Sequence, residues 1–141
     1  MKTESKEIKM TEDQVVTILM EHLKKENWKI VYYCLGSKHG NDIVAEKQGK
    51  TMIVEAKGAM ANSQSKIKKR EKFDSGQIKT HFGKALVKIL EEKEKFPERL
   101  YAIAHPDDAD IKRAIGKIVP FLGQIGIKHY WVSLNKSVKE Q

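Results

Sequence analysis

The segment from Gly40 to Gly58 constrains the fold of this chain more than any other, because its pattern predicts a β-hairpin that is apolar on both faces. It reads GNDIVAEKQGKTMIVEAKG, and the polar Gln48-Gly49 pair between two apolar halves is typical of a tight turn. The residues expected on one face are Ile43, Ala45, Met52 and Val54, and those on the other are Val44 and Ile53. Such a hairpin is normally covered on both faces, as in layered α/β proteins.

Three charged side chains are expected to share one face of this hairpin. If Lys47 and Lys50 pair across the turn, Asp42 lies directly opposite Glu55. Lys57 follows Glu55 by two residues and therefore points to the same face. A turn shifted by one residue would place Asp42 opposite Lys57 and keep the three charges together, whereas a bulge or an odd-length loop would separate them.

These charges border apolar residues, which predicts a cation site. Two carboxylates at the edge of a core repel each other, and one of them keeps its proton unless a cation lies between them. Mg²⁺ suits this position because it takes hard oxygen ligands, usually one or two carboxylates with water and a substrate phosphate. Lys57 would add positive charge where a phosphate gains negative charge during cleavage.

The composition favours a single domain with a polyanionic partner. With 141 residues the chain can form one domain, residues 1–141, and residues 1–10 and 136–141 are expected to be flexible tails. The net charge is +8 and the pI about 9.5, which favours nucleic acid as the partner. The N-terminus lacks the apolar core of a signal peptide, and the longest apolar run, Ile30 to Leu35, is too short to span a membrane. A cytoplasmic location and no membrane partner are expected.

Hydrophobic periodicity and capping residues predict the order helix, three strands, helix, strand, helix, strand. The first helix is capped by Thr11 with Gln14 in a capping box and ends near Lys25. The remaining elements are a strand from Trp28 to Leu35, the hairpin, a helix from Gly76 to Lys93 capped by Asp74 or Ser75, a strand from Leu100 to Ala104 closed by His105-Pro106, a helix capped by Asp107, Asp108 or Asp110 and ended by Pro120 and Gly123, a strand from Ile127 to Leu134, and a tail from Ser137.

Apolar stripes at helical spacing mark the buried face of each helix. The expected core residues are Val15, Val16, Leu19, Met20 and Leu23 in the first helix, Ile78, Phe82, Ala85, Leu86, Ile89 and Leu90 in the second, and Ile111, Ile115, Ile118 and Val119 in the third.

Several polar residues outside the hairpin have both a functional and a plain interpretation. Glu12, in the first turn of the first helix, either joins the hairpin acids or only complements the helix dipole. The basic run Lys66, Lys68, Lys69, Arg70 and Lys72 either follows a phosphate backbone or is a solvated surface. His39, like its neighbour Lys38 in the loop before the hairpin, either contacts phosphate or is simply solvated. A separate polar stripe of the second helix comprises Gln77, His81, Lys84 and Lys88.

Other chemistries find little support in the sequence. The five histidines lack zinc-ligand spacing, and no glycine-rich phosphate loop or nucleophile elbow is present. The single cysteine, Cys34, excludes an internal disulfide and is expected to be a core thiol.

Asp42, twelve intervening residues and then Glu55-Ala56-Lys57 on a hairpin resemble the PD-(D/E)XK nuclease superfamily. The resemblance extends from Thr11 to Leu134, because the element order matches the αβββαβ core of that superfamily. It implies an α/β, restriction-endonuclease-like fold with a central mixed sheet flanked by helices.

The resemblance also implies roles for individual residues. Asp42, Glu55 and the Ala56 carbonyl would bind Mg²⁺ or Mn²⁺, and Lys57 would orient or activate the attacking water. Glu12 resembles the first-helix acid of branches such as the archaeal Holliday junction resolvases. Gln77 resembles a glutamine of exonuclease-like branches, which carry tyrosine four residues later where this chain has His81. Asn41 replaces the proline that names the motif.

We therefore expect a metal-dependent nuclease that hydrolyses phosphodiester bonds in nucleic acid, DNA rather than RNA. Its catalytic residues would be Asp42, Glu55, Lys57, Glu12 and Gln77, and its backbone contacts would come from Lys38, His39, Lys66, Lys68, Lys69, Arg70, Lys72, His81 and Lys84 with Lys88. One alternative is an inactive nuclease-fold module that binds nucleic acid, and another is a structural protein whose acids pair with Lys57. A homodimer is possible, with Tyr130 and Trp131 either at the contact or in the core.

Overall fold

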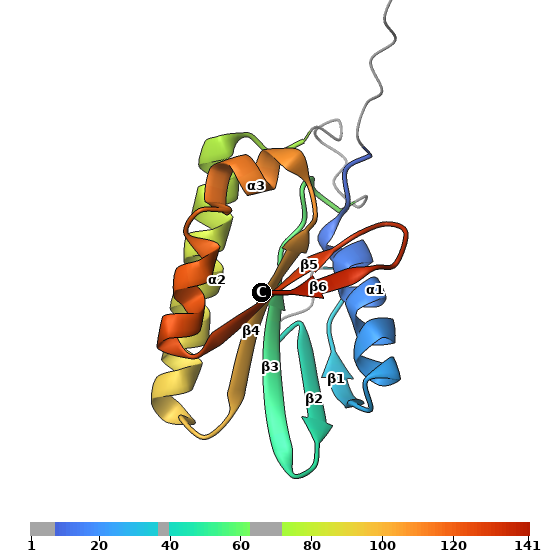
Figure 1. Cartoon of the computed structure of the whole chain (residues 1–141), viewed down its shortest axis with the longest axis vertical. Helices are drawn as coiled ribbons and strands as arrows, with labels where there is room; N and C mark the ends of the chain where they lie inside the picture. The colour runs from blue at the N-terminus through green and yellow to red at the C-terminus, as the bar shows by residue number, and fades with distance from the viewer. Residues whose placement is uncertain (1–7, 37–39, 63–71) are drawn as a thin grey trace, which may run out of the picture.

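A computed structural model gives the fold, and it describes residues 8–36, 40–62 and 72–141. Figure 1 shows the chain as one sheet with helices packed against it. The elements are α1 (Glu12–Lys25), β1 (Lys29–Tyr33), β2 (Ile43–Lys47), β3 (Lys50–Ala56), α2 (Ser75–Lys95), β4 (Leu100–Pro106), α3 (Ala109–Ile115), the 3-10 helix η1 (Val119–Ile125), β5 (Ile127–Val132) and β6 (Val138–Glu140).

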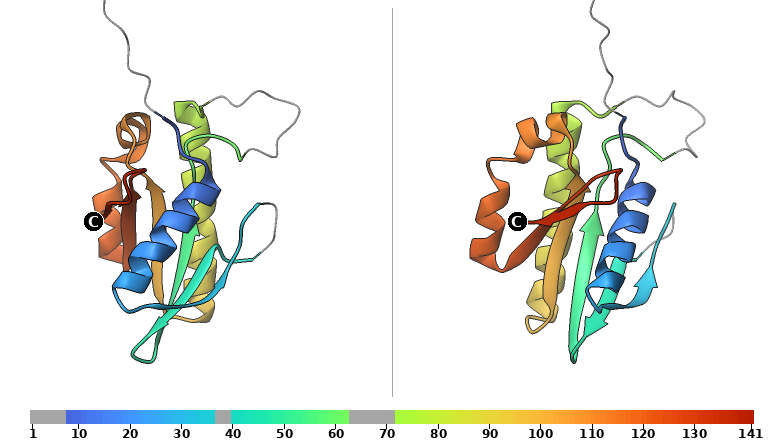
Figure 2. Two further views of the ribbon diagram at one scale, coloured as in Figure 1. Left: turned by 90° about the vertical axis from the view of Figure 1, so that its right-hand side faces the viewer. Right: turned by 45° about the vertical axis from the view of Figure 1, so that its right-hand side comes forward.

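The sheet is mixed and follows the chain order β1-β2-β3-β4-β5-β6. The three strands β1 to β3 pair antiparallel, β3, β4 and β5 pair parallel, and β6 returns antiparallel to β5. Helix α1 covers one face, while α2 and α3 cover the other (Figure 2). The predicted fold class is confirmed: this is an α/β protein with a restriction-endonuclease-like αβββαβ core and a mixed sheet flanked by helices.

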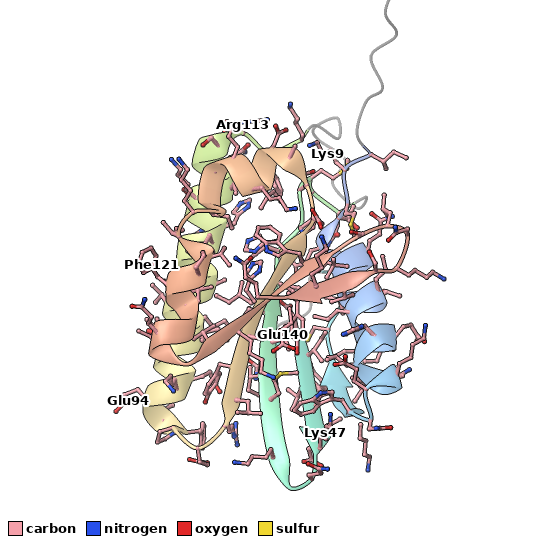
Figure 3. The ribbon with its side chains drawn as sticks, in the orientation of Figure 1. Lys9, Lys47, Glu94, Arg113, Phe121 and Glu140 are labelled. Carbon is pink, nitrogen blue, oxygen red and sulfur yellow. The ribbon has the colours of Figure 1, made fainter. Side chains whose placement is uncertain are left out.

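The hairpin forms in the register expected from the simplest turn. Lys47 pairs with Lys50, and Ile43 pairs with Val54. Gln48 and Gly49 both have positive φ, 52° and 78°, as a two-residue hairpin turn with the twist of its strands requires. Figure 3 shows Lys47 beside this turn, at the end of the sheet opposite Lys9.

The hairpin is also buried on both faces, as predicted. The side chains of Ile43, Ala45, Met52 and Val54 pack in the core under α1. Ile53 is in the core under α2, and Val44 packs against it. Because consecutive strand residues point to opposite faces, this places Asp42, Glu55 and Lys57 on the α2 side of the sheet.

The helix caps follow the sequence closely. Thr11 with Gln14 and Asp74 with Gln77 form complete capping boxes, and Asp108 caps α3. All five predicted core residues of α1 are buried. Two predictions for the other helices are wrong: Leu90 is 40% exposed and Ile118 is 47% exposed, since each points away from the sheet.

Several predicted boundaries are also wrong. Pro120 does not end the third helix but lies in the first turn of the 3-10 helix η1, where a missing N–H costs nothing. The strands at Trp28–Leu35 and Ile127–Leu134 are shorter than predicted, whereas β4 continues through His105 and Pro106.

Residues near both ends of the described chain pack against the body, while the flexibility expected of the two tails stays a prediction. Met10 is buried, and its carbonyl accepts a hydrogen bond from the Ala59 amide at 2.7 Å. At the other end Val138–Glu140 forms β6, and Gln141 exchanges backbone hydrogen bonds with His129. The expectation for residues 1–7 lies outside the described residues.

Two further expectations concern burial and membranes. Tyr130 and Trp131 are 1% and 5% exposed, so they belong to the core rather than to an accessible contact surface. Cys34 is a buried thiol. Within the described part of the chain, no helix has the length and apolar character that crossing a membrane requires.

Candidate active site

Asp42 and Glu55 meet at the end of the hairpin that lies away from its turn. Asp42 immediately precedes β2 and is 8% exposed, and Glu55 in β3 is 3% exposed. The Asp42 carbonyl accepts a hydrogen bond from the Cys34 amide at 3.0 Å, and its carboxylate Oδ2 accepts one from the Ala56 amide at 2.8 Å. The N–H and C=O of one strand residue point to the same side of the strand. The Ala56 carbonyl therefore points, like the Ala56 amide, toward β2 and Asp42.

Glu12 joins these acids because the start of α1 packs directly on the chain after β3. Gly58 makes this approach possible: a Cβ built on it would lie only 2.4 Å from the Glu12 nitrogen. The Ala59 amide donates to the Met10 carbonyl, and a parallel bridge joins Thr11 to Met60. Burial raises the pKa of Glu12, and the negative charge of Asp42 raises it as well, so the two carboxyl groups lie close enough to interact. The structure therefore places Glu12 in the acidic cluster.

The three acids of this cluster all bind protons more tightly than isolated carboxyl groups. Burial is the largest cause and the negative charge of Asp42 is the second, and with the smaller contributions they raise the pKa of Glu12 and that of Glu55 to about 7. Burial also raises the pKa of Asp42, although the hydrogen bond from the Ala56 amide opposes the shift. The cluster thus concentrates negative charge that a proton or a cation must compensate.

Two lysines supply part of that compensation. Lys88 of α2 places its Nζ 3.1 Å from Glu55 Oε2 and donates a hydrogen bond to the Gly40 carbonyl at 2.9 Å. The contact with Glu55 is an ion pair without good hydrogen-bond alignment, since Oε2 is buried and has no directed donor in the described part of the chain. The charge of Lys57 lowers the pKa of Glu12, Asp42 and Glu55.

The donor set fits a hard divalent cation. Asp42 and Glu55 offer carboxylate oxygens and Ala56 a carbonyl, and Mg²⁺ commonly uses one or two carboxylates and completes its shell with water and phosphate. The buried Oε2 of Glu55 is an acceptor that lacks a directed donor in the described region. Among the residues described, however, no three acidic, histidine or cysteine side chains are already gathered around one cation position.

An open pocket of about 210 Å³ lies beside the cluster and is lined by one of its acids, Glu12, and by Lys57. Glu12, Lys57, Asn62 and His81 provide its polar lining. The His81 ring stacks edge-on against Phe73, with ring centroids 4.5 Å apart. Burial lowers the pKa of His81, and the charges of Lys57 and Lys84 lower it further, so the ring is predominantly neutral at pH 7. The pocket could admit a phosphate group next to Lys57.

Other predicted site residues are placed differently. Gln77 is exposed and belongs to the cap of α2, where its Oε1 accepts a hydrogen bond from the Asp74 amide at 2.9 Å. Lys72 pairs with Asp110 at 3.1 Å, and Lys84 is exposed on α2. The predicted contacts that lie outside the described residues are Lys38, His39, Lys66, Lys68, Lys69 and Arg70.

The structure also reveals a buried histidine pair that the sequence interpretation missed. His105 and His129 come from the neighbouring strands β4 and β5, with Nδ1 of one 2.9 Å from Nε2 of the other. Their rings stack with centroids 5.1 Å apart, and burial lowers the pKa of both, that of His129 to about 3. Both residues lie in mostly apolar strands, and this is the signal that could have identified them as buried.

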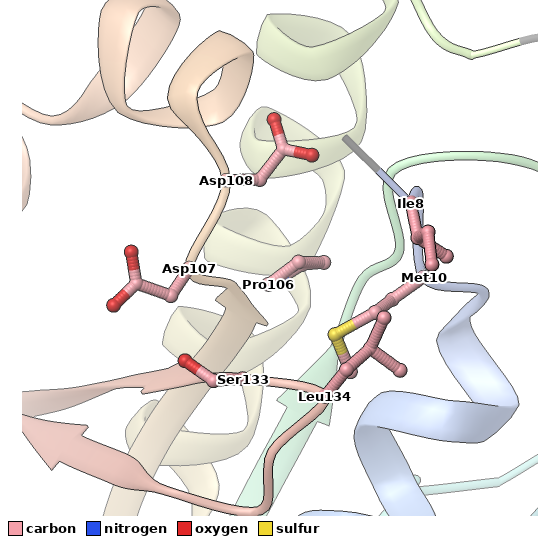
Figure 4. A pocket seen from close by; sticks show the side chains of 7 residues that line it. All are labelled: Ile8, Met10, Pro106, Asp107, Asp108, Ser133 and Leu134. Atoms are coloured by element: carbon pink, nitrogen blue, oxygen red, sulfur yellow. The ribbon is translucent and has the colours of Figure 1, made fainter. Parts of the chain in front are cut away.

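A second cavity, of about 370 Å³, lies where β4 and β5 end (Figure 4). Its two acids already have partners in the protein. Asp107 pairs with Lys112 at 2.6 Å, and Asp108 both caps α3 and pairs with Lys9 at 2.9 Å. The rest of the lining is largely apolar, including Ile8, Met10, Pro106 and Leu134. The cavity therefore lacks the uncompensated charge that distinguishes the acidic cluster.

Comparison with known proteins finds a similarity of fold alone. No family model and no curated protein matches the chain. Two solved structures share the fold. One is an fdxN element excision controlling factor protein from Anabaena variabilis, with 17% identity, a TM-score of 0.54, and coverage of 90% of this chain and 96% of the other. The second is an XisH family protein from Nostoc punctiforme, with 16% identity, a TM-score of 0.55, and coverage of 90% and 97%.

Proposed function

We propose that this protein is a metal-dependent nuclease that hydrolyses phosphodiester bonds in DNA. The observation that carries the proposal is that Asp42, Glu55 and Lys57 lie together at one end of the hairpin. Glu12, in the first turn of α1, lies close to the same group. Two buried carboxylates and an ammonium next to an open pocket are the groups that metal-assisted phosphodiester hydrolysis requires.

Asp42, Glu55 and the Ala56 carbonyl would hold the metal, and Glu12 would add a further carboxylate at the edge of the site. When bound, a divalent cation supplies Lewis-acid polarisation of the phosphate and lowers the pKa of a bound water. The hydrogen bond from the Ala56 amide fixes the orientation of the Asp42 carboxylate. Preorganisation of this kind keeps the oxygens in place without any rearrangement of the strands.

Lys57 would act on the phosphate and on the attacking water. It follows β3 directly and lines the open pocket, so a phosphate there would lie next to its ammonium group. The positive charge stabilises the negative charge that builds up on the phosphate oxygens as the water attacks. His81 on the facing helix is predominantly neutral at pH 7, so it can accept or donate a hydrogen bond without adding charge.

The proposed partner is DNA, held mainly through its backbone. The net charge of +8 supports a polyanionic ligand. His81 of α2 lines the pocket, and Lys84 lies close enough on the same helix for its charge to act on His81. The basic residues between Lys66 and Lys72 would extend this contact. One of the two proteins with the same fold is named for control of an element's excision, and we propose a comparable role on DNA for this chain. Such binding should weaken steeply with salt.

The decisive experiment is nicking of supercoiled plasmid with Mg²⁺ or Mn²⁺ by the wild type and by Glu55→Gln. The substitution removes one charge with little change in shape. We expect metal-dependent nicking by the wild type, abolished by EDTA and reduced at least about a hundredfold in the variant, the size typical of losing one electrostatic group in an active site. Equal nicking by both proteins would contradict the proposal.

A second candidate function is an inactive module that binds DNA with the same face. The observation that favours it is the ion pair between Lys88 and Glu55, which already compensates part of the charge that a metal would compensate. Salt-sensitive DNA binding with no nicking in either metal would support the module. Absence of both activities would instead favour a structural role for the ion pairs.

A further inference from the structure

We propose that Lys88 occupies the cation position at Glu55 in the metal-free protein, and that a divalent cation must displace its ammonium group in order to bind. The inference rests on the proposed function, because it concerns the metal site of the nuclease. It makes Lys88, which is not part of the sequence motif, a counter-ion that competes with the metal for Glu55.

The geometry places the Lys88 ammonium between two oxygens, as a bound cation would be. Nζ lies 3.1 Å from the Glu55 carboxylate and 2.9 Å from the Gly40 carbonyl. The backbone at Gly40 has φ +127°, a conformation that favours glycine, and a Cβ there would lie 3.2 Å from the Tyr32 hydroxyl. The carbonyl that receives Lys88 is therefore fixed by a closely packed glycine backbone.

The electrostatics make Lys88 and a metal competitors. The Lys88 Nζ lies 3.1 Å from Glu55 Oε2, so its ammonium group already places a positive charge at one of the proposed ligands. A divalent cation bound to the same Glu55 oxygen would lie within a few ångströms of the ammonium, and two positive charges at that distance repel strongly in a partly buried site. Metal binding therefore requires the ammonium to leave.

Lys88 can leave without any movement of the helix backbone. Its side chain is 42% exposed, whereas that of Glu55 is 4% exposed. The head group therefore reaches the buried acid from the solvent side, and its flexible stem allows it to swing back into water. After release the ammonium stays on the α2 face that carries Lys84, where it would add to the basic surface.

The test is direct Mn²⁺ binding in the absence of nucleic acid, measured by electron paramagnetic resonance or calorimetry. We expect Lys88→Met and Lys88→Gln to bind Mn²⁺ about tenfold more tightly than the wild type, which corresponds to about 1.4 kcal/mol. Lys88→Arg retains the charge and should bind like the wild type. Lys79→Met removes the same charge from an exposed position of the same helix and should also bind like the wild type.

Thermal unfolding provides a second readout that does not depend on activity. In EDTA, Lys88→Met should melt at a lower temperature than the wild type, because the buried acids lose their counter-charge. Mn²⁺ should raise the melting temperature of Lys88→Met by more than that of the wild type, since tighter binding to the folded state stabilises it more.

The outcomes separate this inference from the function on which it rests. If the wild type binds Mn²⁺ but Lys88→Met and Lys88→Gln bind it equally or more weakly, the competition is wrong and the nuclease proposal stands. An equal gain in Lys79→Met would also overturn it, because general charge would then explain the effect. If no variant binds Mn²⁺ and the wild type does not nick plasmid, both proposals fail.

Discussion

The carboxylate of Asp42 accepts a hydrogen bond from the backbone amide of Ala56 at 2.8 Å. This bond joins the beginning of β2 to the end of β3 and fixes the acid next to Glu55. It also explains why Asp42 differs from its neighbours, since the amide opposes the upward pKa shift that burial causes. The motif residues are thus held in place by the backbone of the motif itself.

Two substitutions of Asp42 should separate its charge from its hydrogen bond. Asp42→Asn retains an oxygen acceptor for the Ala56 amide and removes charge repulsion, so its free energy of unfolding at pH 8 should equal or exceed that of the wild type. Asp42→Ala leaves a buried amide without an acceptor and should cost about 1–3 kcal/mol. Urea unfolding measures both, and equal stabilities of the two variants would contradict this account. We expect neither variant to nick plasmid.

The acidic cluster should make stability depend on pH in the direction opposite to most carboxylates. The pKa of Glu12 and that of Glu55 are raised to about 7 in the folded protein, above the ordinary value of 4.5. Their contribution to stability is therefore complete below about pH 4.5 and is lost as the pH rises through about 7, by up to about 1.4 kcal/mol per pH unit for each group. Urea unfolding of wild type and Glu55→Gln between pH 5 and 8 should show a smaller loss in the variant. Parallel curves would refute this assignment.

The buried histidine pair should destabilise the protein in acid. The pKa values of His105 and His129 are lowered by burial, that of His129 to about 3, whereas an unfolded histidine titrates near 6.5. The unfolded chain therefore binds more protons below about pH 6.5, and stability falls as the pH decreases, by up to about 1.4 kcal/mol per pH unit for each histidine.

Replacing both histidines with leucine should remove this acid sensitivity, because no ionisable group then remains at the pair. The carboxylates oppose the effect in the same pH range, so the informative quantity is the difference between variant and wild type from pH 4.5 to 6.5. The prediction is wrong if that difference does not change with pH.

Gly58→Ala should disturb the docking of α1 and with it the position of Glu12. The added Cβ would lie 2.4 Å from the Glu12 nitrogen and 2.7 Å from the Thr11 carbonyl carbon, which are backbone atoms that cannot move alone. We expect a loss of about 1–3 kcal/mol in unfolding free energy. Gly83→Ala is the matched control, since its Cβ meets nothing within 4 Å in α2 and should stabilise by about 0.5–1 kcal/mol. A Gly58 variant as stable as the wild type would show that the contact has no consequence.

The parts of the fold that the sequence predicted are those determined by local pattern. Apolar residues on either side of the polar turn identified the hairpin and its register. The capping residues Thr11 and Gln14 identified the first turn of α1. The position of Glu12 was left open because it depends on the approach of Gly58, a contact between residues far apart in the chain. Strand β6 was missed because its short, mostly polar sequence becomes a strand only by pairing with β5.

The same distinction applies to the site. Asp42, Glu55 and Lys57 follow from strand periodicity, whereas the partner of Glu55 lies on a helix 33 residues later (88 − 55) and has no motif of its own. Gln77 resembled a catalytic residue by position, yet its side chain caps α2. A capping box uses the same residue types as an active site, so sequence position alone cannot distinguish them.

The close contact between Gly58 and α1 also has a kinetic consequence. Asp42 and Ala56 are neighbours across a short turn, so their pairing closes a small loop, whereas Glu12 and Lys88 must be brought in from distant parts of the chain at a higher entropic cost. We therefore expect the hairpin to be structured in the folding transition state and the docking of α1 to come after it, so that mutational φ-values decrease from the hairpin to Gly58. A folding intermediate with a formed hairpin and an undocked α1 would therefore contain Asp42 and Glu55 in place but would lack Glu12 at the site.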